Sequence, residues 1–239
     1  MVGRTGQRGR STGHFLARAG ALVALLLAGA PARAGEAAPA WPDSVPSRLA
    51  ALALIQTLNA DLLSNASATL TLDRWCAAHK LAATPTIVAD RVTGQDKEAT
   101  PEIRTLLKVG PEEPVRYRRV RLRCGTQVLS EADNWYVPAQ LAPAMNAELD
   151  TTDTSFGRVV RPLGFRRTTL AATLLWQPLP AGWEMGGALP PAGDGALALP
   201  DFVLEHRAVL TLPDGTPFSA LVESYTRAVL AFPPPALPR

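Results

Sequence analysis

The sequence predicts an α+β domain that has a mainly antiparallel sheet and helices grouped near the N-terminus. Three observations support this fold class. Apolar and polar residues alternate at 115–138 and 203–230, as they do in β-hairpins. Pro213-Asp214-Gly215 is a strong turn signal inside the second of these stretches. Between residues 47 and 63 the apolar residues recur instead at spacings of three and four, which is typical of an amphipathic helix.

Residues 1–34 have the composition of a secretory signal peptide. They contain five arginines and no acidic residue, and an uncharged run rich in Leu and Ala extends from Ala19 to Ala30. We therefore expect cleavage after Ala34 and a periplasmic or secreted protein. The apolar run is about a dozen residues, shorter than the roughly 20 that span a bilayer, so no stable membrane insertion is expected after cleavage. An uncleaved anchor is the alternative.

Length and composition predict one folded domain. The chain has 239 residues, of which 47% are apolar, enough for a sizeable core. The expected division is a signal peptide at 1–34, a linker at 35–46, a single domain at 47–230 and a Pro-rich tail at 231–239. Loss of the five signal arginines would turn the net charge of +3 into −2. We therefore expect no nucleic-acid partner, and we expect a monomer.

The other elements are predicted from periodicity, caps and breakers. We expect helices at 69–79, 102–107 and 141–149, a short helix near 154–158, and strands at 84–92 and 166–176. Asn65-Ala66-Ser67 matches a glycosylation sequon but also suits the start of a helix, and we favour the capping role. The segment 177–200 is rich in Gly and Pro and is interpreted as a long loop, either functional or a flexible insertion.

The stretch 115–138 has one apolar face and one face of guanidinium groups. Because side chains alternate along a strand, Val120, Leu122 and Cys124 share the first face, and Tyr117, Arg119, Arg121 and Arg123 share the second. A turn at Gly125-Thr126-Gln127 would fix the register through cross-strand charge pairs. The pairs would be Arg119 with Asp133 and Arg121 with Glu131. A turn shorter by one residue would break this pairing.

Two cysteines, Cys76 and Cys124, would meet an oxidising compartment after export. They could form a disulfide. Each could equally be a small buried hydrophobic residue, because sequence alone does not place two Cα atoms within bonding distance.

The sequence lacks the usual catalytic and metal-binding motifs. His79 and His206 stand far apart and have no cysteine or paired carboxylate at ligand spacing, so we expect no metal and no cofactor. Glu223 lies in the otherwise apolar last strand, where a carboxylate is either a partner in a structural salt bridge or an acid, base or hydroxyl-binding group. Near 154–158, a helix start capped by Asp153 or Thr154 would favour an anion.

Several segments, taken in order, resemble chorismate pyruvate-lyase, which cleaves chorismate to 4-hydroxybenzoate and pyruvate. They are Arg119-Val-Arg-Leu-Arg-Cys-Gly125, Trp135-Tyr-Val-Pro138, Thr154-Ser-Phe-Gly-Arg158 and a Glu in the final strand. Asp214-Gly-Thr-Pro-Phe218 with Glu223-Ser-Tyr225 also looks like the ligand-binding domain of GntR-type transcription regulators, which shares that fold. The resemblance covers roughly residues 58–229 in the order of elements.

The resemblance implies a site for a small aromatic or cyclic carboxylate. In the lyase family an Arg of the first hairpin strand holds the carboxylate, an apolar residue before Gly-Arg lines the ring, and a Glu of the last strand reaches the ring hydroxyl. These roles fall on Arg119, Phe156 and Glu223, with Glu223 as the catalytic residue in an enzyme. Arg158 is a further candidate for substrate binding, and Ala68 is a further apolar position. Phe156 replaces an aliphatic residue of the family and Ala68 a longer one, so the pocket would be reshaped.

Two functions follow from the resemblance. One is an exported lyase-like enzyme, and the other is a non-catalytic small-ligand-binding or sensor domain of the same fold. A structural or partner-binding role is a third. The expected export signal conflicts with the lyase reading, because chorismate chemistry in that family is cytoplasmic. Fold alone does not decide between them.

Overall fold

The computed structural model describes residues 40–236, and every structural statement below concerns these residues. The expected signal peptide at 1–34 lies outside them. None of the helices described there is both long and apolar enough to cross a membrane.

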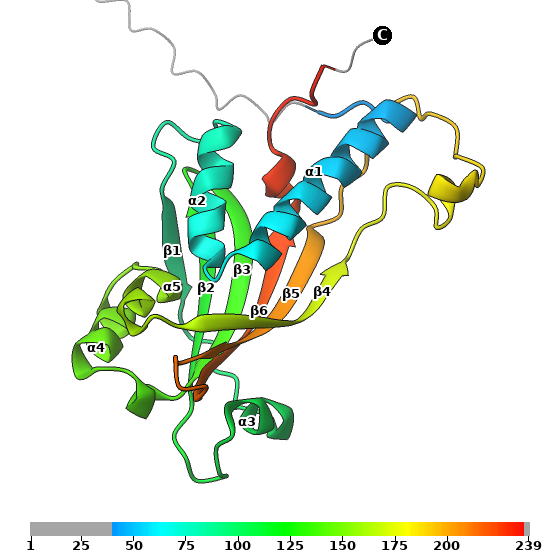
Figure 1. Ribbon diagram of the computed structural model, residues 1–239. Coiled ribbons are helices and arrows are strands. Elements are labelled where there is room, and N and C mark those ends of the chain that lie inside the picture. Colours follow the sequence, from blue (N-terminus) through cyan, green and yellow to red (C-terminus); the bar gives the residue numbers. More distant parts are fainter. Residues whose placement is uncertain (1–39, 237–239) are drawn as a thin grey trace, which may run out of the picture. The chain divides into compact units, whose positions relative to one another are not determined.

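One antiparallel sheet of six strands forms the centre of the domain (Figure 1). Its strands are β1 (Ile87–Val92), β2 (Arg116–Cys124), β3 (Gln127–Tyr136), β4 (Arg166–Leu174), β5 (Phe202–Thr211) and β6 (Pro217–Thr226). They lie in the order β1-β2-β3-β6-β5-β4, so that the two hairpins meet at the β3–β6 pair and β1 and β4 form the edges. The predicted α+β fold with a mainly antiparallel sheet is confirmed.

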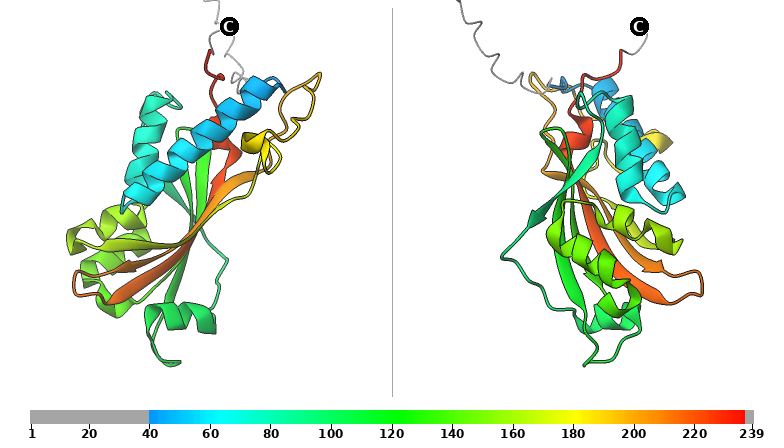
Figure 2. Two further views of the ribbon diagram at one scale, coloured as in Figure 1. Left: turned by 45° about the vertical axis from the view of Figure 1, so that its right-hand side comes forward. Right: turned by 90° about the vertical axis from the view of Figure 1, so that its left-hand side faces the viewer.

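Helices cover both faces of this sheet. They are α1 (Val45–Ser64), α2 (Ala68–Ala78), α3 (Pro101–Leu107), α4 (Pro143–Thr151) and α5 (Phe156–Val159), with short 3-10 turns at Pro138–Gln140, Arg161–Leu163, Trp183–Met185 and Arg227–Leu230. Figure 2 shows α1, α2, α4 and α5 on one face, which we call the inner face. Leu107 of α3 packs on the outer face against Trp135 and Val209.

Serine caps set the starts of the two long helices. The Ser44 hydroxyl accepts a hydrogen bond from the Ser47 backbone N–H at the start of α1, and the Ser67 hydroxyl accepts one from the Leu70 N–H at the start of α2. Each bond satisfies a backbone donor that the helix itself leaves free. The predicted capping role of the Asn65-Ala66-Ser67 segment is therefore confirmed for Ser67.

The register of the central hairpin is the predicted one, but it arises differently. Arg119 pairs with Asp133 and Arg121 with Glu131. The turn has two residues rather than three, because Cys124 pairs directly with Gln127. A β-bulge between this turn and the charge pairs, with Leu129 as the extra residue, shifts β3 by one position and restores the register.

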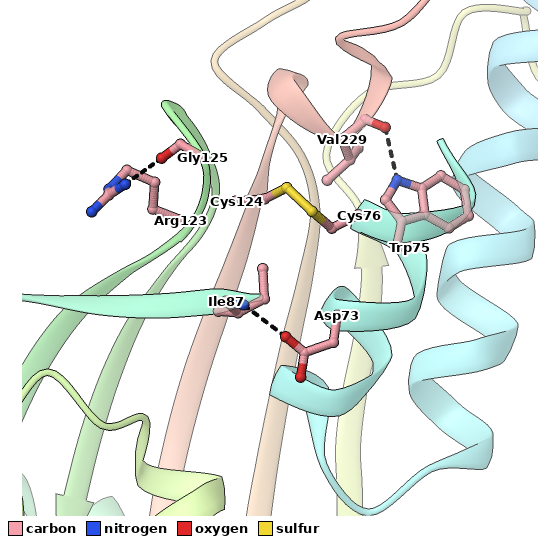
Figure 3. The surroundings of a disulfide bond; sticks show 8 residues. All are labelled: Asp73, Trp75, Cys76, Ile87, Arg123, Cys124, Gly125 and Val229. Carbon is pink, nitrogen blue, oxygen red and sulfur yellow. Dashed lines mark hydrogen bonds between the residues drawn. A yellow bond between two sulfur atoms is a disulfide. The ribbon is translucent and has the colours of Figure 1, made fainter. Parts of the chain in front are cut away.

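A disulfide joins the C-terminal part of α2 to the end of β2 (Figure 3). Cys76 and Cys124 have their Cα atoms 6.2 Å apart. Nearby, the Trp75 Nε1–H donates to the Val229 carbonyl at 2.9 Å, and Asp73 Oδ1 accepts from the Ile87 N–H at 2.7 Å. The helix is thus fastened to the sheet by one covalent bond and two hydrogen bonds.

Segments expected to be a linker and a tail contribute to the core. Trp41, from the expected linker, is buried and donates from Nε1 to the Phe232 carbonyl at 2.8 Å. Phe232, from the expected tail, is buried as well and stacks on the His79 ring at 4.0 Å between ring centres. The packed part of the chain therefore extends beyond 47–230 on both sides.

Candidate functional site

A small cavity lies between the inner face of the sheet and the starts of α2 and α5. Its volume is about 50 Å³, enough for a few water molecules or one small ligand group at roughly 10–15 Å³ per water. The apolar wall consists chiefly of Val120, Leu122, Ala132, Phe156, Phe165 and Leu221. Four large polar side chains also line it, namely Arg118, Asn134, Arg167 and Glu223. The cavity is therefore apolar with a few charged groups, as ligand sites usually are.

The strand register explains which residues meet in the cavity. Val120 of β2 lies opposite Ala132 of β3, which lies opposite Glu223 of β6. Paired residues of an antiparallel sheet point to the same face, so all three face inward. Arg118 lies two residues before Val120 on β2, opposite Asn134, and therefore also faces inward.

Arg118 is a buried cation that has no carboxylate partner among residues 40–236. It is only 7% exposed, and its Nη2 donates to the Thr154 carbonyl at 3.1 Å. Its Nε and Nη1 have no acceptor among residues 40–236. Burial, with the nearby charge of Arg91, lowers the pKa of Arg118 to about 10. A buried charge with unsatisfied donors is costly unless an anion pairs with it.

Arg167 and Glu223 form a buried ion pair across the sheet. Arg167 Nη2 lies 2.7 Å from Glu223 Oε2, and the two side chains are only 5% and 9% exposed. The Tyr225 hydroxyl donates to the same oxygen at 3.1 Å. Burial acts to lower the pKa of Arg167, but the Glu223 carboxylate outweighs it and the net shift is upward. With Arg118 included, the cavity holds two cations and one anion, a net charge of about +1.

The structure brings three of the predicted site residues together. Glu223, Phe156 and Ala68 all line the cavity. Arg158 does not. It donates to the Ile87 carbonyl and to Asp73 at 2.6 Å, and so it fastens α5 to β1 and α2.

Arg119 requires a correction. It lies on the outer face, where it forms salt bridges with Glu131 at 2.6 Å and Asp133 at 3.2 Å. Its register partner Asp133 lies opposite Val222, whereas the cavity carboxylate Glu223 lies opposite Ala132. Neighbouring positions of a strand point to opposite faces, so Arg119 and Glu223 cannot share a cavity. The expectation that they face one pocket is wrong, and Arg118 is the cavity arginine of this strand.

A protein of similar sequence shows the family to which this chain belongs. The protein called "Uncharacterized protein y4mC", from Sinorhizobium fredii (strain NBRC 101917 / NGR234), is 63% identical over 198 residues, which cover 82% of this chain and 84% of the relative. The chain belongs to the y4mC family. No protein-family model matches it.

Solved structures of low similarity include transcriptional regulators. A GntR-family regulator from Enterococcus faecalis V583 is 13% identical with a TM-score of 0.38, over 63% of this y4mC-family chain and 99% of that chain. A ligand-binding domain assigned to a GntR-family regulator of Bordetella bronchiseptica is 13% identical with a TM-score of 0.36, over 58% and 82%. The possible transcriptional regulator YydK of Bacillus subtilis subsp. subtilis str. 168 is 16% identical with a TM-score of 0.36. That match spans 59% of this chain and 58% of YydK, less than two thirds of its length.

These matches bear on two expectations. GntR-type ligand-binding domains, which the sequence resembles, are found among the structural neighbours, while the resemblance to chorismate lyase stays a prediction. The neighbours are described as transcriptional regulators, and this finding contradicts the periplasmic or secreted location expected from residues 1–34. The expectation of a periplasmic or secreted protein is therefore wrong.

Sequence reasoning missed three polar residues of the cavity in this y4mC-family chain, and one of them had a signal. Arg118 is in phase with Val120 and Leu122, so the alternation that defined the apolar face already placed a charge on it. A charged residue in phase with an apolar face is a better candidate for a site than one on a charged face. Arg167 and Asn134 carried no such signal, because their approach to Glu223 and Arg118 depends on strand order.

Proposed function

We propose that the domain binds a small carboxylate, aromatic or cyclic, without transforming it, and that Arg118 holds the acid group. The observation that carries the proposal is the buried guanidinium of Arg118, whose Nε and Nη1 have no acceptor among the described residues. Each of these two nitrogens can donate to a carboxylate oxygen, and hydrogen bonds between charged partners are the strong ones.

The charge and lining of the cavity support a monoanion with a ring. A carboxylate would bring the net charge of about +1 close to zero. Hydrogen bonds between charged partners contribute about 1.5–3 kcal/mol each. The rings of Phe156 and Phe165, both in the cavity wall, would contact an apolar ring. The volume of about 50 Å³ favours a small occupant.

Glu223 gives the cavity a second specificity. One of its oxygens, Oε2, already accepts from Arg167 and Tyr225. The other oxygen can accept from a hydroxyl on the ligand, so hydroxylated ring acids should bind more tightly than unsubstituted ones. Glu223→Gln should weaken the hydroxylated acids selectively.

Chorismate cleavage is the second candidate, because Glu223 lies in the same cavity as an arginine. Glu223 Oε2 already accepts from Arg167 and Tyr225, so only its other oxygen remains for a substrate. Incubation of the purified protein with chorismate separates the two readings. Release of 4-hydroxybenzoate that Glu223→Gln slows by about 10²- to 10⁴-fold would establish the lyase.

Titration calorimetry on the full chain tests the binding proposal. The ligands are benzoate, 4-hydroxybenzoate and cyclohexanecarboxylate, with benzamide as the uncharged analogue. We expect the acids to bind and benzamide to bind at least 10-fold more weakly, since each decade corresponds to about 1.4 kcal/mol. Arg118→Met should abolish acid binding, and the matched variant Arg119→Met should keep it. Equal loss in both variants, or no acid bound by the wild type, would contradict the proposal.

A further inference from the structure

The two edges of the sheet differ in how their backbones are satisfied. At β1, the Ile87 N–H donates to Asp73, the Ile87 carbonyl accepts from Arg158, and the Ala89 N–H donates to the Asp153 carbonyl at 3.1 Å. Side chains and a loop thus cover this edge. Within residues 40–236, the backbone of β4 forms backbone hydrogen bonds only with its neighbour β5.

Beyond its first two residues, the uncovered edge has no charge and no proline to prevent strand pairing. From Thr168 to Trp176 the sequence is Thr-Thr-Leu-Ala-Ala-Thr-Leu-Leu-Trp, without a charge or a proline. Natural sheets usually place charges or prolines on a free edge, because its open N–H and C=O groups bind a further strand. The devices that β4 does have are the bulge at Leu170 and the charges of Arg166 and Arg167 at its start.

Exposed apolar side chains lie on β4 and in the segment that follows it. Five large hydrophobic residues of the described region are exposed, and four of them lie on β4 or in the segment that follows it. These are Leu170, Leu175, Met185 and Leu189, which are between 41% and 87% exposed. Leu170 and Leu175 lie on β4 or directly after it, and exposed apolar side chains beside an open strand edge favour an interaction surface.

We propose that β4 pairs antiparallel with β4 of a second copy of this chain, which joins the two six-stranded sheets into one continuous sheet. An antiparallel pair of identical strands is related by a two-fold axis, so one patch serves both copies and the assembly closes as a dimer. The pairing brings no like charges together over Thr168–Trp176, and it sets Thr, Leu and Ala opposite one another, which suits cross-strand contacts. The dimer replaces the monomer expected from the sequence.

The ladder with β5 shows which backbone groups would bond to the second copy. The Leu175 N–H donates to the Val203 carbonyl at 3.0 Å and so points toward β5. Because these directions alternate along a strand, the N–H groups of Ala172 and Leu174 point to the free edge. Proline at Ala172 therefore removes a bond to the partner and leaves the β4–β5 ladder complete.

Sedimentation velocity on the full chain, over a range of concentrations, tests this proposal. We expect a wild-type dimer, with the Ala172 and Leu174 amides protected from hydrogen exchange. Ala172→Pro should give a monomer, while Ala188→Pro, in the exposed loop after β4, should leave the dimer intact. If Ala172 pairs with Leu174 of the second copy, the two-fold axis lies at Thr173, and Thr173→Lys sets two like charges opposite each other without altering the backbone. This variant should also give a monomer and decides the matter if Ala172→Pro unfolds.

Three results would overturn the proposal. They are a wild type that is monomeric at every concentration, a dimer that survives Thr173→Lys with the Ala172 and Leu174 amides unprotected, and open-ended oligomers in place of a dimer.

Discussion

Replacing Arg118 by Met should stabilise the ligand-free protein. The pKa of Arg118 falls from 12.5 to about 10 on folding, chiefly through burial. At about 1.4 kcal/mol for each power of ten in proton affinity, the folded protein holds this charge at a cost of about 3 kcal/mol. Methionine is unbranched and uncharged although shorter than arginine, but the bond to Thr154, worth about 1 kcal/mol, is lost. We expect the free energy of unfolding to rise by about 2 kcal/mol.

The same substitution should remove the stabilisation that a ligand provides. A ligand present at 100 times its dissociation constant raises the free energy of unfolding by about 2.7 kcal/mol. Wild type should gain this amount with benzoate, and Arg118→Met should gain none. Urea unfolding with and without benzoate measures both effects, and equal m-values in the two proteins show that the unfolded states are comparable. The variant is then the more stable protein without ligand, and the advantage disappears when ligand is added.

Arg119→Met is the matched control on the outer face. This arginine has two carboxylate partners and is partly exposed, so its loss should cost about 0.2–1 kcal/mol and leave the effect of benzoate unchanged. The reasoning fails if Arg118→Met destabilises the ligand-free protein as a broken salt bridge would. It also fails if benzoate stabilises Arg118→Met as much as wild type.

Three further predictions concern the fold. Burial, with Asp133, raises the pKa of Tyr117 to about 12. The contribution of this shift to stability is therefore complete below pH 10 and is lost as the pH rises from 10 toward 12. Absorbance near 295 nm should show no tyrosinate at pH 10, and ionisation at lower pH would contradict this. Reduction of the disulfide, which spans 48 residues, should lower the free energy of unfolding by about 2–4 kcal/mol in urea, and a smaller change would mean that the hydrogen bonds beside it suffice. Gly125→Ala should destabilise the protein more than Gly94→Ala does. Both glycines have positive φ, but only at Gly125 would the new Cβ lie 2.7 Å from Ala82 Cβ. Equal melting temperatures of the two variants would refute this.

The sequence predicted the elements well because each has local signals. Apolar spacing located α1, alternation located the hairpins, and Pro213-Asp214-Gly215 located the last turn. The turn of the central hairpin was misjudged because two solutions give the same register. A three-residue turn and a two-residue turn with one bulge both set Arg119 opposite Asp133. Charge pairing read from the sequence fixes the register and leaves the turn undetermined.

The site was only partly predictable, for a different reason. Glu223, Phe156 and Ala68 came from the resemblance, and the cavity includes all three. The choice of Arg119 over Arg118 ignored strand parity, which the sequence contains. The pairing of Arg167 with Glu223 depends on β4 lying next to β5 and β5 next to β6, and no local pattern encodes that order.

The extra residue at Leu129 governs the charge state of the cavity. With the same two-residue turn and no bulge, β3 would be displaced by one position, and Asp133 rather than Asn134 would lie opposite Arg118. The arginine would then have a carboxylate beside it and nothing to offer an incoming anion. With the chain length unchanged, a hairpin without the bulge would turn Ala132 and Asn134 away from the cavity and turn Glu131 and Asp133 toward it. Deletion of Leu129 would remove the bulge and still keep Arg118 opposite Asn134, because every later residue of β3 would move up by one position.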